Sequence, residues 1–235
     1  MTEWKAKRFW KDVSVREADG GFDVALDTRP VRTPAKVPLV LPTRAMADAV
    51  AAEWAAQQDG IDPTTMPATR AANAAIDKVA PQFDEVAAML SAYGDSDLLC
   101  YRADEPQELV ARQAEGWDPL LDWADDTFGA RLVPRAGVMH VPQDGDALAR
   151  LDAEVRRLSP FQMAGFHDLV SLSGSLILAL AATRDHRPAD TLWALSRIDE
   201  EWQAEQWGHD EEAEDAARIK RNSFLEAKRF YDLAT

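Results

Sequence analysis

A dense group of acidic side chains lies between residues 199 and 215, where the sequence reads DEEWQAEQWGHDEEAED. This stretch holds nine carboxylates, no lysine or arginine, and two tryptophans, Trp202 and Trp207. Carboxylates at this density can hold a cation or attract a basic partner, and large aromatic side chains are typical anchors of protein contacts. Two kinds of chemistry therefore compete here, metal binding and capture of a protein.

Metal binding would use Glu205 and His209, which are four residues apart and would share one face of a continuous helix. His167 and its neighbour Asp168 could add ligands from another helix. Gly208, however, is expected to end or kink the helix between the two ligands, and no ExxH or HExxH pattern occurs. A metal–carboxylate enzyme is therefore the alternative interpretation. The preferred one has no metal, no cofactor and no catalytic residue.

Other catalytic chemistry has little support in the sequence. There is no GxGxxG or GxxxxGK[ST] pattern for a nucleotide, and the small residues at 171–175 are typical of close helix packing. Cys100 lies in the apolar stretch DLLCYRAD, which indicates a buried, inert thiol. Ser173 lacks the GxSxG context of a serine nucleophile.

The composition excludes several classes of partner. The chain has 235 residues and a formal net charge of −15, which disfavours nucleic acid and anionic membrane surfaces. Its longest apolar run, residues 175–182, is too short to span a bilayer, so no membrane insertion is expected. The single cysteine indicates a reducing compartment, and MTEWKAKRFW contains no signal or transit pattern. We expect a bacterial cytoplasmic protein.

The elements that must position the acidic stretch follow a simple order. Alternating apolar residues flank the turn pair Gly20-Gly21 and predict two antiparallel strands, and residues 37–41 predict a third, irregular one that contains Pro38. One more strand is expected near residues 30–33. Thr43 caps a helix at 44–58, and further helices are predicted at 69–79, 81–93, 107–128, 146–158, 160–183, 188–207 and 209–233.

These elements predict an α+β fold with two domains. Residues 1–78 would form a small antiparallel β-containing domain that includes helix 44–58, and residues 79–235 a helical bundle domain. Residues 131–141 would make a short extended connection between helices. Trp54 falls on the apolar face of helix 44–58, and Trp117 and Trp123 are expected to be core anchors.

Helical periodicity separates the residues of the acidic stretch. Trp202 continues an apolar stripe through Leu195 and Ile198 and is predicted to be core, whereas Trp207 lies roughly 140° further round the helix. In a helix of residues 188–207, the three acids at 199–201 precede the carboxyl end, where the helix dipole disfavours negative charge. Acidic residues that lower helix stability without an evident structural gain indicate a functional role. The acids after Gly208 should instead form a solvated helix start.

An ordered set of motifs resembles a known family. RFWKDVSV, LDTRPVRTP, LPT, AEWAAQQ, IDPTTMPATR, DLLCYRAD, QAEGWDPLLDW and DEEWQAEQWG together are similar to the assembly chaperones of the ATP synthase F(1) sector that bind its alpha subunit, the "ATP-twelve" proteins of mitochondria and alphaproteobacteria. The similarity runs from about residue 8 to about residue 208 and into the last helix. No single motif is diagnostic, but their order is.

The resemblance implies a monomeric, non-enzymatic chaperone that protects the free alpha subunit from aggregation until a beta subunit replaces it. An acidic position that matters in the family corresponds to one of Asp199, Glu200 and Glu201. These acids, with Gln203 and Trp207, are the expected partner-binding residues. The residues expected to support the fold are Trp54, Trp117, Trp123, Trp202 and Gly208.

Overall fold

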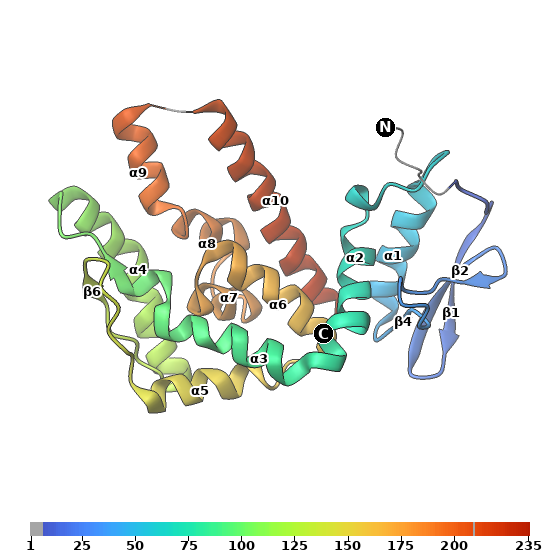
Figure 1. The fold of residues 1–235 in the computed structure, drawn as a ribbon, viewed down its shortest axis with the longest axis horizontal. Coiled ribbons are helices and arrows are strands. Elements are labelled where there is room, and N and C mark those ends of the chain that lie inside the picture. The colour runs from blue at the N-terminus through green and yellow to red at the C-terminus, as the bar shows by residue number, and fades with distance from the viewer. Residues whose placement is uncertain (1–6, 209) are drawn as a thin grey trace. The chain divides into compact units, whose positions relative to one another are not determined.

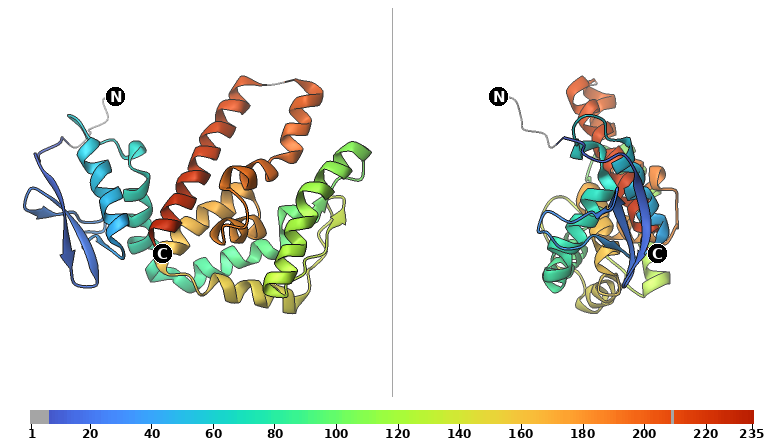
Figure 2. Two further views of the ribbon diagram at one scale, coloured as in Figure 1. Left: turned by 180° about the vertical axis from the view of Figure 1, so that it is seen from behind. Right: turned by 90° about the vertical axis from the view of Figure 1, so that its right-hand side faces the viewer.

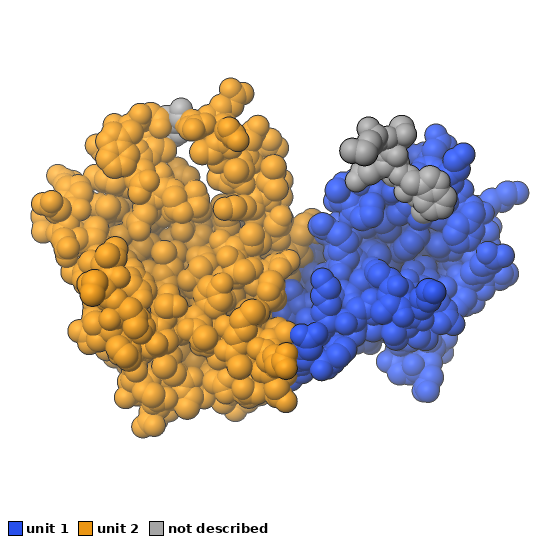
Figure 3. Space-filling view, viewed as in Figure 1, with its two compact units in different colours: residues 1–83, 159–165, 229–235 blue, residues 84–158, 166–228 orange. Residues whose placement is uncertain are grey.

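The structure is a computed structural model that describes residues 7–208 and 210–235. The chain divides into two compact units, which Figure 3 shows in different colours. Unit 1 comprises residues 1–83, 159–165 and 229–235, and unit 2 comprises residues 84–158 and 166–228. The domains predicted at 1–78 and 79–235 stay a prediction, because a compact packing unit is not the same as an independently folding domain.

Unit 1 is built around an antiparallel sheet of four strands (Figure 1). The strands are β1 (Val13–Ala18), β2 (Gly21–Leu26), β3 (Arg29–Pro30) and β4 (Val40–Leu41), and β2 pairs with each of the other three. The turn between β1 and β2 uses Gly20, whose φ is +84°. Gly21 has a second reason to be glycine: a Cβ there would lie 2.2 Å from the Leu41 carbonyl oxygen. Close backbone approach is therefore built into this hairpin.

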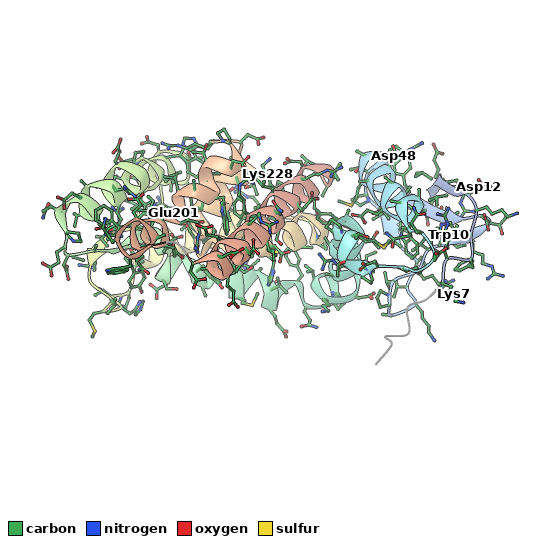
Figure 4. All side chains as sticks on the ribbon, turned by 90° about the horizontal axis from the view of Figure 1, so that it is seen from above. Lys7, Trp10, Asp12, Asp48, Glu201 and Lys228 are labelled. Atoms are coloured by element: carbon green, nitrogen blue, oxygen red, sulfur yellow. The ribbon has the colours of Figure 1, made fainter. Side chains whose placement is uncertain are left out.

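Helix α1 (Arg44–Ala56) packs on the sheet of unit 1 and closes its core. Thr43 caps the helix by accepting a 3.1 Å hydrogen bond from the Met46 N–H, as predicted. Met46 and Val50 are fully buried, and Trp54 is half-buried. The Trp54 ring meets the buried Trp10 ring edge to face, with centroids 5.3 Å apart (Trp10 is labelled in Figure 4). Each tryptophan thereby gains apolar contact from the other.

Helix α2 (Pro67–Ala74) begins at a carboxylate from α1 rather than at a side-chain cap of its own. Both carboxylate oxygens of Glu53 are used: Oε1 accepts from the Ala68 N–H at 2.7 Å, and Oε2 from the Thr69 N–H at 2.8 Å and the Thr69 hydroxyl at 2.6 Å. The negative charge also faces the positive end of the α2 dipole. Glu53 therefore joins α1 to α2.

The Glu53→Ala variant is expected to lose about 2 kcal/mol of unfolding free energy, because three donors around a half-buried acceptor lose their partner. Urea titration followed by circular dichroism measures this loss. Asp48→Ala on the same helix is the control, since its exposed ion pair with Arg44 is worth less than about 0.5 kcal/mol. Equal losses in the two variants would contradict the capping role.

The rest of the chain is mainly helical, so the predicted α+β fold class is confirmed (Figures 1 and 2). Two short strands pair in parallel, β5 (Tyr101–Arg102) and β6 (Arg135–Ala136). The remaining helices are α3 (Phe83–Ser91), α4 (Gln107–Phe128), α5 (Gly145–Val155), α6 (Pro160–Ser173), α7 (Leu176–Thr183), α8 (Ala189–Leu195), α9 (Ile198–Trp207) and α10 (Glu211–Leu233). Over the residues that the structure describes, none of these helices is long and apolar enough to cross a membrane.

The single helix predicted for residues 160–183 is wrong, because the chain breaks between α6 and α7. Gly174 adopts a left-handed φ of +70°, and the side chain of Ser175 caps α7 by accepting from the Leu178 N–H at 3.0 Å. The carboxylate of Asp97 accepts from the Ile177 N–H at 3.0 Å. Asp97 is fully buried and lies about eighty residues earlier in the chain. The apolar periodicity continues across the break and therefore could not reveal it.

The single helix predicted for residues 188–207 is also wrong, because α8 and α9 are separate. In a continuous helix the Leu195 carbonyl would accept from the Asp199 N–H. It accepts instead from the indole Nε1 of Trp117 on α4, at 2.7 Å. Gly116 permits this approach: a Cβ there would lie 2.8 Å from the Ile198 Cδ1 atom. A buried indole donor requires an acceptor, and the break in the helix supplies it.

Candidate partner-binding site

The break after α8 changes the electrostatic position of the acidic triplet. Asp199, Glu200 and Glu201 form the first turn of α9, not the end of a longer helix. The positive end of the α9 dipole therefore stabilises them, and the predicted dipole cost is wrong. Three acids at a helix start are compatible with stability. Their partners, rather than the helix position, must decide whether they are free for binding.

The three acids differ in their partners. The Asp199 carboxylate is half-buried and accepts a 2.6 Å hydrogen bond from the Gln113 side chain on α4. Glu200 forms an ion pair with Arg197, one turn earlier, at 2.5 Å. Glu201, labelled in Figure 4, is exposed, and within the described part of the chain its carboxylate has no hydrogen bond or ion pair. Glu201 is therefore the acid most available to an incoming cation.

The side of α9 that faces α4 is held by a cation–π contact and an ion pair. The Arg112 guanidinium lies 5.1 Å from the centroid of the Trp202 ring and makes two hydrogen bonds, of 2.8 and 2.9 Å, to the Glu205 carboxylate. Trp202 is half-buried rather than fully buried, so it anchors the helix at the edge of the core instead of within it. Arg112 orders both side chains at once.

The outward side of α9 carries the other predicted contact residues. Glu200, Gln203 and Trp207 are spaced i, i+3 and i+7 and so share one side of the helix, with Glu201 next to Glu200. Trp207 is 80% exposed, and Gln203 is also exposed. We call Glu200, Glu201, Gln203 and Trp207 the α9 face. It combines negative charge, an amide and a large aromatic ring on a helix that α4 supports from behind.

Residues 7–208 and 210–235 contain no set of side chains that could bind a metal ion. Glu205, its first candidate ligand, is bound to Arg112, and His209 lies outside the described residues. Gly208 ends α9 with a φ of +96°, which separates Glu205 from the helix that follows. His167 pairs with the adjacent Asp168 at 2.9 Å, which raises its pKa. In this part of the chain, no three His, Cys, Asp or Glu side chains are grouped so that they could hold an ion.

The candidate nucleophiles are part of the core. Cys100 is buried, and this burial, with the nearby charge of Asp97, raises the pKa of its thiol to about 12, so it stays a neutral thiol near pH 7. Ser173 is buried and donates its hydroxyl proton to the Leu169 carbonyl at 2.6 Å. Both side chains serve packing and local hydrogen bonding.

Trp117 and Trp123, the other two tryptophans predicted as core anchors, lie in unit 2 and are buried to different degrees. Trp117 is fully buried on α4 and bonds the α8 carbonyl, as described. Trp123 is half-buried and stacks on His186, with ring centroids 4.7 Å apart. Both lie on α4, whose bounds are those predicted even though Pro119 lies inside the helix. The α4 helix is therefore the frame on which α9 is mounted.

Gln113 is a positioning residue that the sequence analysis missed. It is almost fully buried, donates to Asp199, and accepts a 2.8 Å hydrogen bond from the Ala103 N–H. One signal was available: Gln113 lies four residues before Trp117, on the same apolar side of α4. A polar side chain at such a position needs buried partners, and here one of them is the first acid of α9.

This chain is similar to ATP12 proteins both in sequence and in structure. Residues 7–125 match the model of the ATP12 chaperone protein family. The protein atp12, mitochondrial, of Schizosaccharomyces pombe is 24% identical over 221 residues, which cover 88% of this chain and 75% of that protein.

Solved structures extend the similarity over the whole chain, including α9. The crystal structure of Atp12 from Paracoccus denitrificans is 56% identical, with a TM-score of 0.96 over 99% of this chain and all of that chain. An aspartate-to-lysine mutant of the same protein gives the same identity and TM-score over the whole of both chains. A structure from Agrobacterium tumefaciens is 43% identical, with a TM-score of 0.94 over 97% of this chain and 86% of that chain. The chain therefore belongs to the ATP12 chaperone protein family, whose members are chaperones and not enzymes.

Proposed function

We propose that the protein is an assembly chaperone of the ATP synthase F(1) sector, which binds the unassembled alpha subunit until a beta subunit replaces it. Membership of the ATP12 chaperone family supports a role in assembly. The resemblance of the ordered motifs to alpha-binding chaperones supports the choice of client. Binding would take place through the α9 face, in the bacterial cytoplasm, by a monomer.

The observation that carries this proposal is that α9, a helix supported by α4, exposes both Glu201, which has no ion pair among the described residues, and the large aromatic side chain of Trp207. A free alpha subunit would expose a surface that beta normally covers, partly apolar and partly lined with arginine. The acids of the α9 face would pair with arginine, and Trp207 would cover apolar surface. Such binding imitates an interface and requires no catalytic chemistry.

Release would follow from competition. A beta subunit that buries a larger part of the same alpha surface would displace the chaperone, because a larger and better-fitting contact dissociates more slowly. An exposed helical face on one side of the chaperone suits this exchange, since it covers only part of a client surface. The chaperone is therefore expected to bind tightly enough to prevent aggregation and weakly enough to be replaced.

The direct test is to produce the alpha subunit of the same organism with and without this protein. We expect alpha to remain soluble only when the protein is present, to co-purify with it, and to leave the complex when beta is added. Light scattering and size-exclusion chromatography measure these three outcomes. Equal aggregation of alpha in both cases, or a preference for beta as the bound subunit, would contradict the proposal.

A further inference from the structure

The connection between α4 and α5 carries exposed apolar side chains that the fold does not use. Val138 is 88% exposed and Met139 is 81% exposed, the two highest values among the large hydrophobic side chains that the structure describes. Isolated exposed apolar residues are common on protein surfaces, but an adjacent pair at the end of a loop is a candidate contact. We call Val138 and Met139 the loop tip.

The chain before the loop tip is held by the backbone. Strand β6 pairs in parallel with β5, with Arg135 opposite Tyr101 and Ala136 opposite Arg102. The Gly137 N–H then donates a 2.9 Å hydrogen bond to the Arg102 carbonyl. Gly137 has a φ of +85°, which turns the chain directly before the tip.

The chain after the loop tip is held by side chains. His140 lies between the Tyr101 hydroxyl and the Asp95 carboxylate, with Nδ1 and Nε2 each 3.3 Å from its partner oxygen. The second oxygen of Asp95 accepts from the Gln143 N–H at 2.7 Å. The Gln143 amide in turn bonds both the N–H and the carbonyl of Val133, at 2.8 and 3.0 Å. The tip is therefore exposed although the chain is fixed on both sides of it, so little conformational entropy is lost on binding.

A partly buried chain of hydrogen bonds connects the loop tip to α9 within unit 2. In the first bond, the Gly137 N–H donates to the Arg102 carbonyl. In the second, the N–H of the next residue, Ala103, donates to the side-chain oxygen of Gln113 at 2.8 Å. Gln113 then donates to Asp199 at 2.6 Å. The residues that hold the base of the loop and those that hold the first turn of α9 thus belong to one network. The two exposed features have a fixed relation to each other.

We infer that the loop tip is a second contact for the same client that the α9 face binds, and that it covers apolar surface of the unassembled alpha subunit. This inference rests on the proposed function. Asp104 and Glu105 are exposed on the segment that follows β5, next to Gly137 at the base of the tip. Arg135 is the one cation of β6. The tip therefore suits an apolar client surface that is bordered mainly by basic groups. That is the same chemistry that the α9 face suits.

The test compares two double variants of the full-length protein for binding to purified alpha subunit. Val138→Ser with Met139→Ser removes the apolar tip. Ile219→Ser with Met89→Ser removes two other exposed apolar side chains, which are 61% and 48% exposed, and is the matched control. We expect the tip variant to raise Kd about tenfold or more, through faster dissociation, and the control to change Kd less than about twofold. Thermal unfolding checks that both variants remain folded.

Salt dependence separates the tip from the α9 face. The tip variant should keep the salt dependence of the unmodified protein, because an apolar contact is not screened, whereas Glu201→Lys should reduce it. Binding that is unchanged in the tip variant but lost in Glu201→Lys overturns this inference and leaves the proposed function intact. Failure of the unmodified protein to bind alpha overturns both. A tip variant that only removes self-association of the chaperone also overturns the inference.

Discussion

Glu201→Lys is expected to weaken binding to the alpha subunit about tenfold while the chaperone stays folded. The substitution removes an exposed carboxylate that has no ion pair among residues 7–208 and 210–235, and it places a positive charge opposite basic client groups. The folded state should lose less than about 0.5 kcal/mol, because the side chain is on the surface. Surface plasmon resonance with purified alpha measures the affinity, and thermal unfolding measures the fold.

A matched control separates local contact from total charge. Glu212→Lys makes the same change in charge at the first turn of another helix, α10. It should leave the affinity within about twofold, since a screened charge outside the contact acts weakly. If the two variants weaken binding equally, the effect is one of net charge, and the α9 face is not the contact.

The other two acids, Asp199 and Glu200, should respond differently to substitution. Asp199→Asn keeps an oxygen that can accept from Gln113, so it should preserve the α9 position and reduce affinity only slightly. Asp199→Lys breaks that hydrogen bond as well as reversing the charge, so it should lower the affinity for alpha more than Glu200→Lys does. Replacement of all three acids by lysine should abolish co-purification of alpha. Unchanged co-purification would overturn the assignment of the α9 face.

Asp97→Ala is expected to destabilise the protein by about 4 kcal/mol, the largest effect on stability that the structure indicates. The Asp97 carboxylate is fully buried and accepts from the Leu99 N–H and the Ile177 N–H, each at 3.0 Å. Its loss leaves the buried Leu99 N–H, and the Ile177 N–H at the start of α7, without this acceptor. Urea titration measures the change. Asp126→Ala, at an exposed position of α4, should cost less than about 0.5 kcal/mol.

The same carboxylate makes stability depend on pH. Burial raises the pKa of Asp97 to about 6 from 3.8, although hydrogen bonds from the Ser175 side chain and the Ile177 and Leu99 backbone oppose the shift. Since the folded state then binds the proton more tightly, this contribution to stability is present below about pH 4 and is lost as pH rises through 6. It amounts to about 3 kcal/mol. In the Asp97→Asn variant this part of the pH dependence should disappear. If the unfolding free energy of the variant changed with pH between 4 and 6 as it does in the unmodified protein, the role of Asp97 would be contradicted.

The sequence by itself determined the elements whose signals are local. The α4 helix has the predicted bounds, because the apolar periodicity is continuous and Gly129 ends the helix with a φ of +63°. The Gly20-Gly21 hairpin and the Thr43 cap followed from turn and cap chemistry within a few residues. The ordered motifs also indicated the chaperone family, which the comparisons show.

The tertiary structure decided where the long helical segments break and which acid is free. Asp97 and Trp117 supply partners to backbone groups at the start of α7 and at the end of α8, from about eighty residues away in the sequence. Periodicity within a segment carries no information about such partners, so two predicted helices became four. The break before Asp199 then moved the acids to the favourable end of a dipole, and pairing with Gln113 and Arg197 left Glu201 exposed and unpaired within the described chain. Acidic character is a property of the sequence, whereas availability of a charge depends on which neighbours the fold brings to it.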